Sequence, residues 1–195
     1  PGLTRTDQSS VSFTPLQNLF GMITPSGLHF ERHHQGWVDI DPRRHRLMIN
    51  GLVETPLVFA MEELLRMPSV SRIHFIECGA NTGLEWGNVA VPTVQYSHGM
   101  LAASEFTGIP VSLLLERAGF DRKRATVLLA EGADGSSMTR TINLENALDD
   151  ALVAYGQNGE MLRPENGYPL RLVVPGVQGV SLSLIHISEP TRQEA

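Results

Sequence analysis

Four short segments of the sequence place reactive or charged side chains at spacings that suit chemistry on a bound metal or oxyanion. They cover residues 30–34, 77–81, 131–137 and 163–171. In turn they contain an arginine beside two histidines, a cysteine, a glycine-rich polar loop and an arginine behind two prolines. Thiols and imidazoles are metal ligands, and guanidinium groups bind oxyanions through paired hydrogen bonds.

Cys78 is the single cysteine of the chain, so no intrachain disulfide is possible. It follows a β-prone run and precedes Gly79, which places the thiol at the mouth of a loop. There the sulfur can serve as a nucleophile or as a metal ligand. A buried structural thiol is the alternative, because free cysteine is among the most buried residue types.

The segment around Arg32 carries two adjacent histidines, His33 and His34. Neighbouring residues on an extended segment point to opposite sides, so the two imidazoles are poorly placed to chelate one metal. Arg32 with one histidine could instead hold a phosphate or a sulfur oxyanion. A solvated polar loop is the alternative interpretation.

The loop containing Asp134 and Gly135 offers backbone N–H groups and hydroxyls to a polar ligand but matches neither nucleotide-binding glycine pattern. An ordinary turn explains it equally well. In the last segment, Pro164 and Pro169 stiffen the backbone around Asn166 and Arg171. A fixed arginine there suits a phosphate, and an ion pair with a surface carboxylate is the alternative.

The elements that must position these groups form a mixed pattern of strands and short helices. We expect strands over residues 72–78, 126–130 and 170–174, a hairpin turn at Asn50-Gly51, and helices over residues 59–67 and 110–118. Gly119 should end the second helix. The pattern favours an α+β fold with long loops.

Composition excludes several classes of protein. The 195 residues include 42% hydrophobic and 18% charged residues, which suits one globular domain or one domain with a fragment of another. The formal charge of −6 makes general nucleic-acid binding improbable, and the apolar runs are too short for a membrane span. Residues 1–12 lack the features of a targeting peptide.

Taken in order, four phrases resemble the molybdopterin-binding domain of the sulfite oxidase family, and within it the molybdenum subunits of Sox-pathway sulfane dehydrogenases. They are FERHHQGW, HFIECGANTGLEWGN, AEGADGSSMTRT and MLRPENGYPLRLVVPGVQGV. The resemblance implies the family's α+β fold, with mixed β-sheets, short helices and long loops. It also implies the molybdenum-molybdopterin cofactor (Moco).

The resemblance implies a role for each candidate residue. Cys78 would bind molybdenum as a thiolate, Arg32 would draw in anionic substrate, and Arg171 would contact the pterin phosphate. These two groups, Arg32 and Cys78, are the implied catalytic residues. The implied cofactor-binding residues are Phe30, Arg32, His33, His34, Cys78, Asp134, Asn166 and Arg171. Sulfite oxidases usually carry histidine at the position of Asn166.

The implied reaction is molybdenum-dependent oxidation of reduced sulfur by oxo transfer, with electrons passed to a c-type cytochrome subunit. The substrate would be sulfane sulfur on a sulfur-carrier protein, or sulfite, and the family's usual compartment is the periplasm. Thr82 and Gly83 follow Asn81, where sulfite oxidases have two arginines. This loss of positive charge favours a bulkier, less charged substrate over free sulfite.

The resemblance also divides the chain. We expect an arm over residues 1–13, the molybdopterin-binding domain over residues 14–181, incomplete at its C-terminal end, and a tail over residues 182–195 that resembles no part of the family. We interpret that tail as translated adapter or vector sequence. The family's immunoglobulin-like dimerisation domain has no counterpart here, and the parent protein would be oligomeric through it.

Three other functions stay open at this point. A sulfite dehydrogenase or a methionine-sulfoxide-reductase-like molybdoenzyme would differ in substrate and share the metal. From another class, Cys78 with His33 or His34 could form a thiol hydrolase, and this predicts hydrolysis without metal. A non-catalytic binding module would keep Cys78 buried and unreactive.

Overall fold

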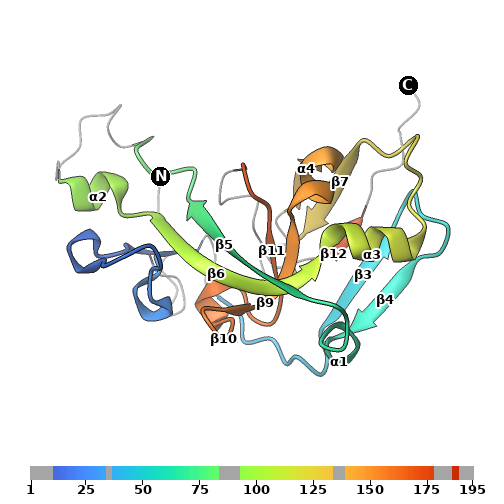
Figure 1. Ribbon diagram of the computed structural model, residues 1–195, viewed down its shortest axis with the longest axis horizontal. Coiled ribbons are helices and arrows are strands. Elements are labelled where there is room, and N and C mark those ends of the chain that lie inside the picture. Colours follow the sequence, from blue (N-terminus) through green and yellow to red (C-terminus); the bar gives the residue numbers. More distant parts are fainter. Residues whose placement is uncertain (1–10, 34–36, 84–92, 134–138, 178–185, 189–195) are drawn as a thin grey trace.

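The structure is a computed structural model that describes residues 11–33, 37–83, 93–133, 139–177 and 186–188. Within these residues the chain forms two five-stranded sheets and one two-stranded sheet, with short helices at their ends (Figure 1). The expected α+β class is therefore confirmed. Of the candidate residues, His34 and Asp134 lie outside the described part of the chain.

The first large sheet carries most of the candidate site. Its strands are β5 (Val70–Glu77), β6 (Leu101–Pro110), β9 (Leu152–Gln157), β10 (Glu160–Met161) and β11 (Arg171–Val173). The order is β10-β9-β6-β5, and β11 also pairs with β9. All these pairs are antiparallel. In Figure 1 the long strands β5 and β6 run from the end near α2 (Val94–His98) toward the second sheet.

The second sheet lies at the opposite end of β6. Its strands are β3 (Arg46–Asn50), β4 (Leu57–Ala60), β7 (Val127–Glu131), β8 (Thr139–Asn143) and β12 (His186–Ser188). β3 with β4 and β7 with β8 form two antiparallel hairpins. β12 lies between them, parallel to β3 and antiparallel to β7. Three residues of the segment that the sequence set apart as a tail thus belong to this sheet.

Short helices connect the strands. They are α1 (Met61–Leu64), α2, α3 (Val111–Ala118) and α4 (Leu144–Asp149), with 3-10 turns at Leu16–Asn18, Ser26–Leu28 and Pro164–Asn166. α3 ends at Gly119, whose φ of 67° is left-handed, as expected. The helix expected over residues 59–67 is shorter, because the backbone through Ala60 pairs with β3 as strand β4.

The core lies where α3 packs against the strands. Fully buried side chains come from β3, β6, α3 and β9, and include Leu47, Phe106, Leu114 and Val153. β3 alternates exposed and buried residues, as one covered face requires. Burial of this apolar surface is the main force that fixes the ends of β6, β9 and β11, and hence the loops that follow them.

Gly108 marks a very close approach between β6 and β9. A Cβ atom there would lie 2.3 Å from the Val153 carbonyl oxygen and 2.5 Å from the Ala154 Cα. We expect Gly108→Ala to lower the free energy of unfolding by about 3 kcal/mol, measured by urea denaturation, because backbone must move. Gly83→Ala, whose Cβ meets nothing within 4 Å, should change it by less than about 0.5 kcal/mol. Equal stability of the two variants would contradict the close approach.

Candidate functional site

Cys78 lies directly after β5 and begins a tight turn. Its thiol is free and partly buried, and it packs against the core. The Cys78 N–H donates to the Met100 carbonyl over 3.0 Å, and the Asn81 N–H donates to the Cys78 carbonyl over 2.8 Å. The strand before Cys78 is confirmed. The sequence suggests a flexible loop after it, but these bonds hold the end of β5 to the residue that precedes β6.

Asn81 braces this turn through its side chain, a role that the sequence analysis did not assign. The residue is 6% exposed. Its Oδ1 accepts from the Met100 N–H over 3.1 Å, and its Nδ2 donates to Glu77 Oε1 over 2.8 Å. The backbone N–H and the backbone carbonyl of Met100 are therefore both hydrogen-bonded to the Cys78 turn. The asparagine between Cys78 and Thr82 was visible in the sequence, but its partner was not.

Thr82 completes the turn in a strained conformation. Its φ is 60°, in the left-handed region that β-branched residues rarely adopt. Its N–H donates to the Ser97 carbonyl over 2.7 Å, which ties the turn to α2. A strained backbone persists only where surrounding contacts determine it, and such positions cluster at functional sites.

Phe30 connects the first candidate segment to the Cys78 turn. It is 6% exposed, and its N–H donates to Thr14 Oγ1 over 3.1 Å. The Thr14 N–H in turn donates to the Gly99 carbonyl over 2.8 Å. Gly99 is the neighbour of Met100, so Thr14 links the Phe30 segment to the same stretch of backbone that holds Cys78. The structure therefore brings these two predicted segments together.

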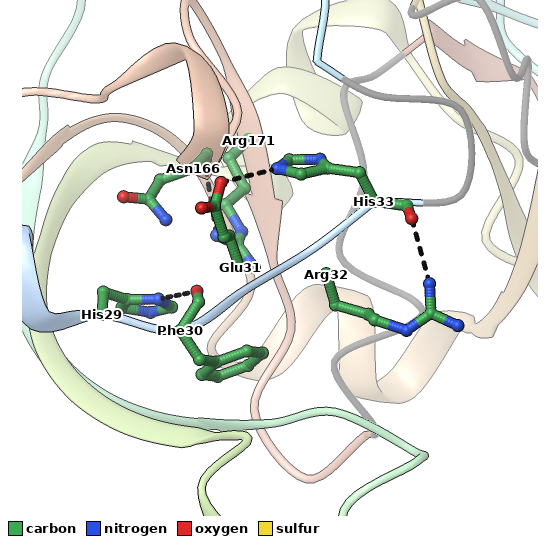
Figure 2. A network of polar contacts seen from close by, with 7 residues as sticks. All are labelled: His29, Phe30, Glu31, Arg32, His33, Asn166 and Arg171. Atoms are coloured by element: carbon green, nitrogen blue, oxygen red, sulfur yellow. Dashed lines mark hydrogen bonds and ion pairs between the residues drawn. The ribbon is translucent and has the colours of Figure 1, made fainter. Parts of the chain in front are cut away.

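Arg32 and His33 make local contacts (Figure 2). The residues Glu31–Arg32 form strand β2, paired with β1 (Val11–Ser12). Arg32 Nη1 donates to the His33 carbonyl over 3.0 Å, and His33 Nε2 lies 3.1 Å from Glu31 Oε2. Residues two apart on a strand share a side, which explains the pairing of Glu31 with His33. The His33 ring is thereby engaged by a carboxylate, and Arg32 by backbone.

Arg171 starts β11 behind the turn that contains Asn166. Its Nη1 donates to the Asn166 carbonyl over 3.0 Å, and its Nε is buried without a hydrogen-bond partner. Burial lowers the pKa of Arg171 to about 10. Among the ion pairs of the described residues, none involves Arg171. The alternative interpretation, a surface ion pair, thus finds no support among the described residues, and a partly buried cation without a counter-charge is costly.

His29 joins this group although the sequence analysis passed over it. It is 7% exposed and stacks on Phe30 with ring centroids 4.9 Å apart. Its Nδ1 lies 2.7 Å from the Phe30 carbonyl oxygen, and its Nε2 is buried without a partner. Burial, followed by the positive charge of Arg171, lowers the pKa of His29 from 6.5 to about 4. The only feature of the sequence that could have indicated a role for His29 is its position directly before Phe30.

Three buried polar atoms without partners therefore gather in one cluster, the His29–Asn166–Arg171 cradle. They are His29 Nε2, Asn166 Oδ1 and Arg171 Nε. Figure 2 shows Asn166 beside Arg171, the Glu31 carboxylate in front of the Arg171 guanidinium, and His29 below Asn166 next to Phe30. Buried polar groups are normally hydrogen-bonded, so unpaired ones point to an unfilled ligand position. A positive charge beside them favours an anionic group.

Comparison with known proteins identifies the family. The family model described as the oxidoreductase molybdopterin binding domain matches residues 34–184, which is more than half of the chain. The chain belongs to this family. Membership confirms the resemblance to a molybdopterin-binding domain that the sequence showed.

Two kinds of relative place the domain within larger proteins. It is 45% identical to a chain in the crystal structure of the sulfane dehydrogenase SoxCD from Paracoccus pantotrophus, with a TM-score of 0.87, covering 98% of this chain and 50% of that one. It is 34% identical over 190 residues to the NADPH nitrate reductase of Phytophthora infestans, covering 90% of this chain and 21% of the relative. A Petunia hybrida NADH nitrate reductase is 36% identical over 186 residues, covering 85% and 20%.

The molybdopterin-binding domain therefore spans about half of the sulfane dehydrogenase chain and about a fifth of the nitrate reductases. In the described part of the chain, no helix has the length and apolar character of a membrane span. The same residues contain no group of three or more histidine, cysteine, aspartate or glutamate side chains that could hold a metal.

The depressed pKa of His29 predicts acid sensitivity. Between pH 6.5 and 4 the unfolded chain binds a proton at His29 that the folded domain does not, so stability falls as pH decreases through this window. The shift corresponds to about 3 kcal/mol. We expect the stability of the wild type relative to His29→Gln to fall by about that amount from pH 7 to pH 4, measured by urea denaturation. A difference that does not change with pH would show that His29 titrates normally.

Proposed function

We propose that this domain is the molybdenum-cofactor part of a dehydrogenase that oxidises reduced sulfur. The observation that carries the proposal is the 45% identity to the sulfane dehydrogenase over 98% of the chain, against 34–36% for the two nitrate reductases. This chain would thus share the substrate class of the sulfane dehydrogenase that it resembles.

Cys78 is the proposed metal ligand. A thiolate is a soft ligand suited to molybdenum, and the thiol follows directly after a strand on a backbone held by Met100 and Asn81. When bound, the cofactor supplies two-electron oxygen-atom transfer to sulfur. The contribution of the chain is to fix the sulfur ligand. Because the turn is braced on both sides, the thiolate is held in one orientation without further reorganisation.

The His29–Asn166–Arg171 cradle is the proposed seat of the cofactor's phosphate. Arg171 provides a partly buried positive charge whose buried Nε–H is unpaired, and this suits a phosphate oxygen. Phe30 and His33 border the same segment, and we assign His34 and Asp134 to the cofactor as well, from the resemblance alone. The unpaired Nε–H of the Arg171 guanidinium is the structural reason for expecting an anion there.

Arg32 is the proposed substrate-attracting residue, with Cys78 as its catalytic companion. The described turn that follows Cys78 contains Thr82 and Gly83. It has no charged side chain, and Glu77, just before Cys78, is the nearest one in the sequence. A less positive approach favours sulfane sulfur on a carrier protein over free sulfite. The proposed partners are accordingly a sulfur-carrier protein and a c-type cytochrome subunit, in a periplasmic and oligomeric parent enzyme.

Nitrate reduction is a second candidate, because the nitrate reductases match 85–90% of the chain. Sulfite dehydrogenase and methionine-sulfoxide-reductase-like activities share the same metal site. A panel containing a protein persulfide, sulfite, methionine sulfoxide and nitrate, with a c-type cytochrome for the oxidations and a reduced viologen for the reductions, separates these activities. Turnover of the persulfide supports the proposal, and turnover of nitrate alone overturns it.

The experiment that tests the cofactor assignment compares the chain with its Cys78→Ser variant. Both are purified from a host that makes the cofactor, and molybdenum, pterin and the metal's X-ray absorption are measured. We expect near-equimolar molybdenum and pterin in the wild type. The variant should lose one sulfur neighbour of molybdenum or lose the metal, because a hydroxyl is a poorer ligand for a soft site. An unchanged sulfur count would contradict Cys78 as the ligand.

A further inference from the structure

The turn between β9 and β10 contains a residue with more hydrogen bonds than a turn requires. Asn158 and Gly159 form this two-residue turn, with positive φ angles of 51° and 80°. The strand residues on either side of them are paired with each other. Asparagine followed by glycine suits such a turn, because both tolerate the left-handed region. The hairpin therefore explains the backbone of the turn, but it does not explain the contacts of the Asn158 side chain.

Asn158 extends the pairing of β6 beyond the end of β9. Its N–H donates to the Glu105 carbonyl over 2.8 Å, and its side-chain Oδ1 accepts from the Glu105 N–H over 2.9 Å. The pairing of β9 with β6 begins only at Phe106. Asn158 thus continues the sheet by one residue, with a side-chain oxygen in place of a backbone carbonyl.

Thr24 occupies the next place along the same edge of β6. Its N–H donates to the Ala103 carbonyl over 2.7 Å, and its Oγ1 accepts from the Ala103 N–H over 3.2 Å. Asn158 Nδ2 donates to the Thr24 carbonyl over 2.9 Å and to Ser26 Oγ over 3.2 Å. The side-chain amide of Asn158 therefore fastens this early part of the chain to a turn near the other end of the described chain.

Residues 24–30, the connecting segment, lead from this anchor to the candidate site. Its middle is the 3-10 turn Ser26–Leu28, which the His29 N–H closes by donating to the Ser26 carbonyl over 3.3 Å. Phe30 follows directly. Because the turn is compact and closed by hydrogen bonds, a shift of Ser26 is passed on to Phe30.

We propose that Asn158 is a positioning residue that fixes the segment carrying Phe30 and Arg32. The proposal rests on the proposed function, in which this segment borders the cofactor and attracts the substrate. Asn158 holds the start of the connecting segment, and Thr14 holds its end. With both ends fastened, the segment keeps one position relative to the sheet and the Cys78 turn.

The proposal requires the side-chain amide and the left-handed backbone together. Glycine at position 158 would keep the backbone but offers no side chain. Aspartate would keep the acceptor for the Glu105 N–H, but its carboxylate would face the Thr24 carbonyl, and both groups only accept. The two substitutions therefore separate the role of Oδ1 from the role of Nδ2.

The test measures amide hydrogen exchange, residue by residue, in the full chain at pH 7. In both Asn158→Gly and Asn158→Asp, we expect the N–H groups of Thr24 and Phe30 to exchange about tenfold faster than in the wild type, because two hydrogen bonds to the connecting segment are lost. The Glu105 N–H should stay protected in Asn158→Asp and exchange faster in Asn158→Gly. This split follows only if the two side-chain atoms have the separate roles that the contacts give them.

Two controls separate this effect from a general loss of stability. The N–H groups of Cys78 and Asn81 should keep their wild-type exchange in both Asn158 variants, because their acceptors lie outside the connecting segment. Asn143→Ala is the matched variant. It removes another asparagine side-chain contact, the cap on the Glu145 N–H at the start of α4, and should leave exchange in the connecting segment unchanged.

Ser26→Ala tests the same contact from its other side. It removes one partner of Asn158 Nδ2 and leaves the turn between β9 and β10 intact. We expect the Phe30 N–H to exchange about threefold faster, because one hydrogen bond is lost. This variant keeps the proposal falsifiable even if changes at the turn prevent folding.

The cofactor-loaded enzyme gives a second readout. With the protein persulfide as substrate, Asn158→Gly should raise KM at least about threefold, while kcat changes by less than about twofold and the molybdenum content stays at the wild-type level. The reason is that a displaced Arg32 attracts substrate less well, whereas Cys78 keeps its place. Asn143→Ala should change neither constant.

Unchanged exchange at Thr24 and Phe30 in the Asn158 variants and in Ser26→Ala would overturn the proposal. Equal acceleration at Cys78, or a loss of kcat with KM unchanged, would also overturn it. Failure of the proposed function looks different. A chain that turns over no sulfur substrate but shows the expected exchange pattern refutes the enzyme assignment, whereas a sulfur dehydrogenase with unchanged exchange refutes the role of Asn158 alone.

Discussion

The backbone at Gly99 and Met100 is the constraint on which the site depends. Gly99 accepts from Thr14, which in turn holds Phe30, and Met100 exchanges hydrogen bonds with Cys78 and the Asn81 side chain. Two segments that are far apart in the sequence are thus fastened to adjacent peptide groups. Their relative position is set by main-chain geometry, which varies far less than side-chain rotamers.

The surroundings of Arg171 are organised by charge. Arg171 is held by the Asn166 carbonyl, and it has no carboxylate partner among the ion pairs of the described chain. The folded domain carries the cost of that cation, together with a histidine kept neutral beside it. An anion bound beside Arg171 would offset this cost and thereby stabilise the folded domain.

Local patterns predicted the elements well, because each left a mark within a few residues. The strand before Cys78, the helix before Gly119 and the strand at Arg171 all appear as expected. The predicted helix over residues 59–67 was too long. Its first residues pair with β3 as part of β4, and this tertiary contact outweighs the helical spacing of the apolar residues. His29 and Asn81 were missed for the same kind of reason. Asn81 bonds to Met100, 19 residues further on, and His29 is influenced by the charge of Arg171 near the other end of the described chain. A polar residue type alone does not reveal such contacts.

The outer edge of β5 has a consequence for how the domain behaves in solution. In the described chain β5 pairs with β6 alone, and Ile73 and Phe75 on it are 49% and 58% exposed. An eight-residue strand with an open row of amide and carbonyl groups is a template for pairing with another copy. The two charged residues on this strand, Arg72 and Glu77, are already engaged by Asp150 and Asn81. Self-association through this edge should therefore depend on the exposed Ile73 and Phe75 and persist when salt screens surface charges.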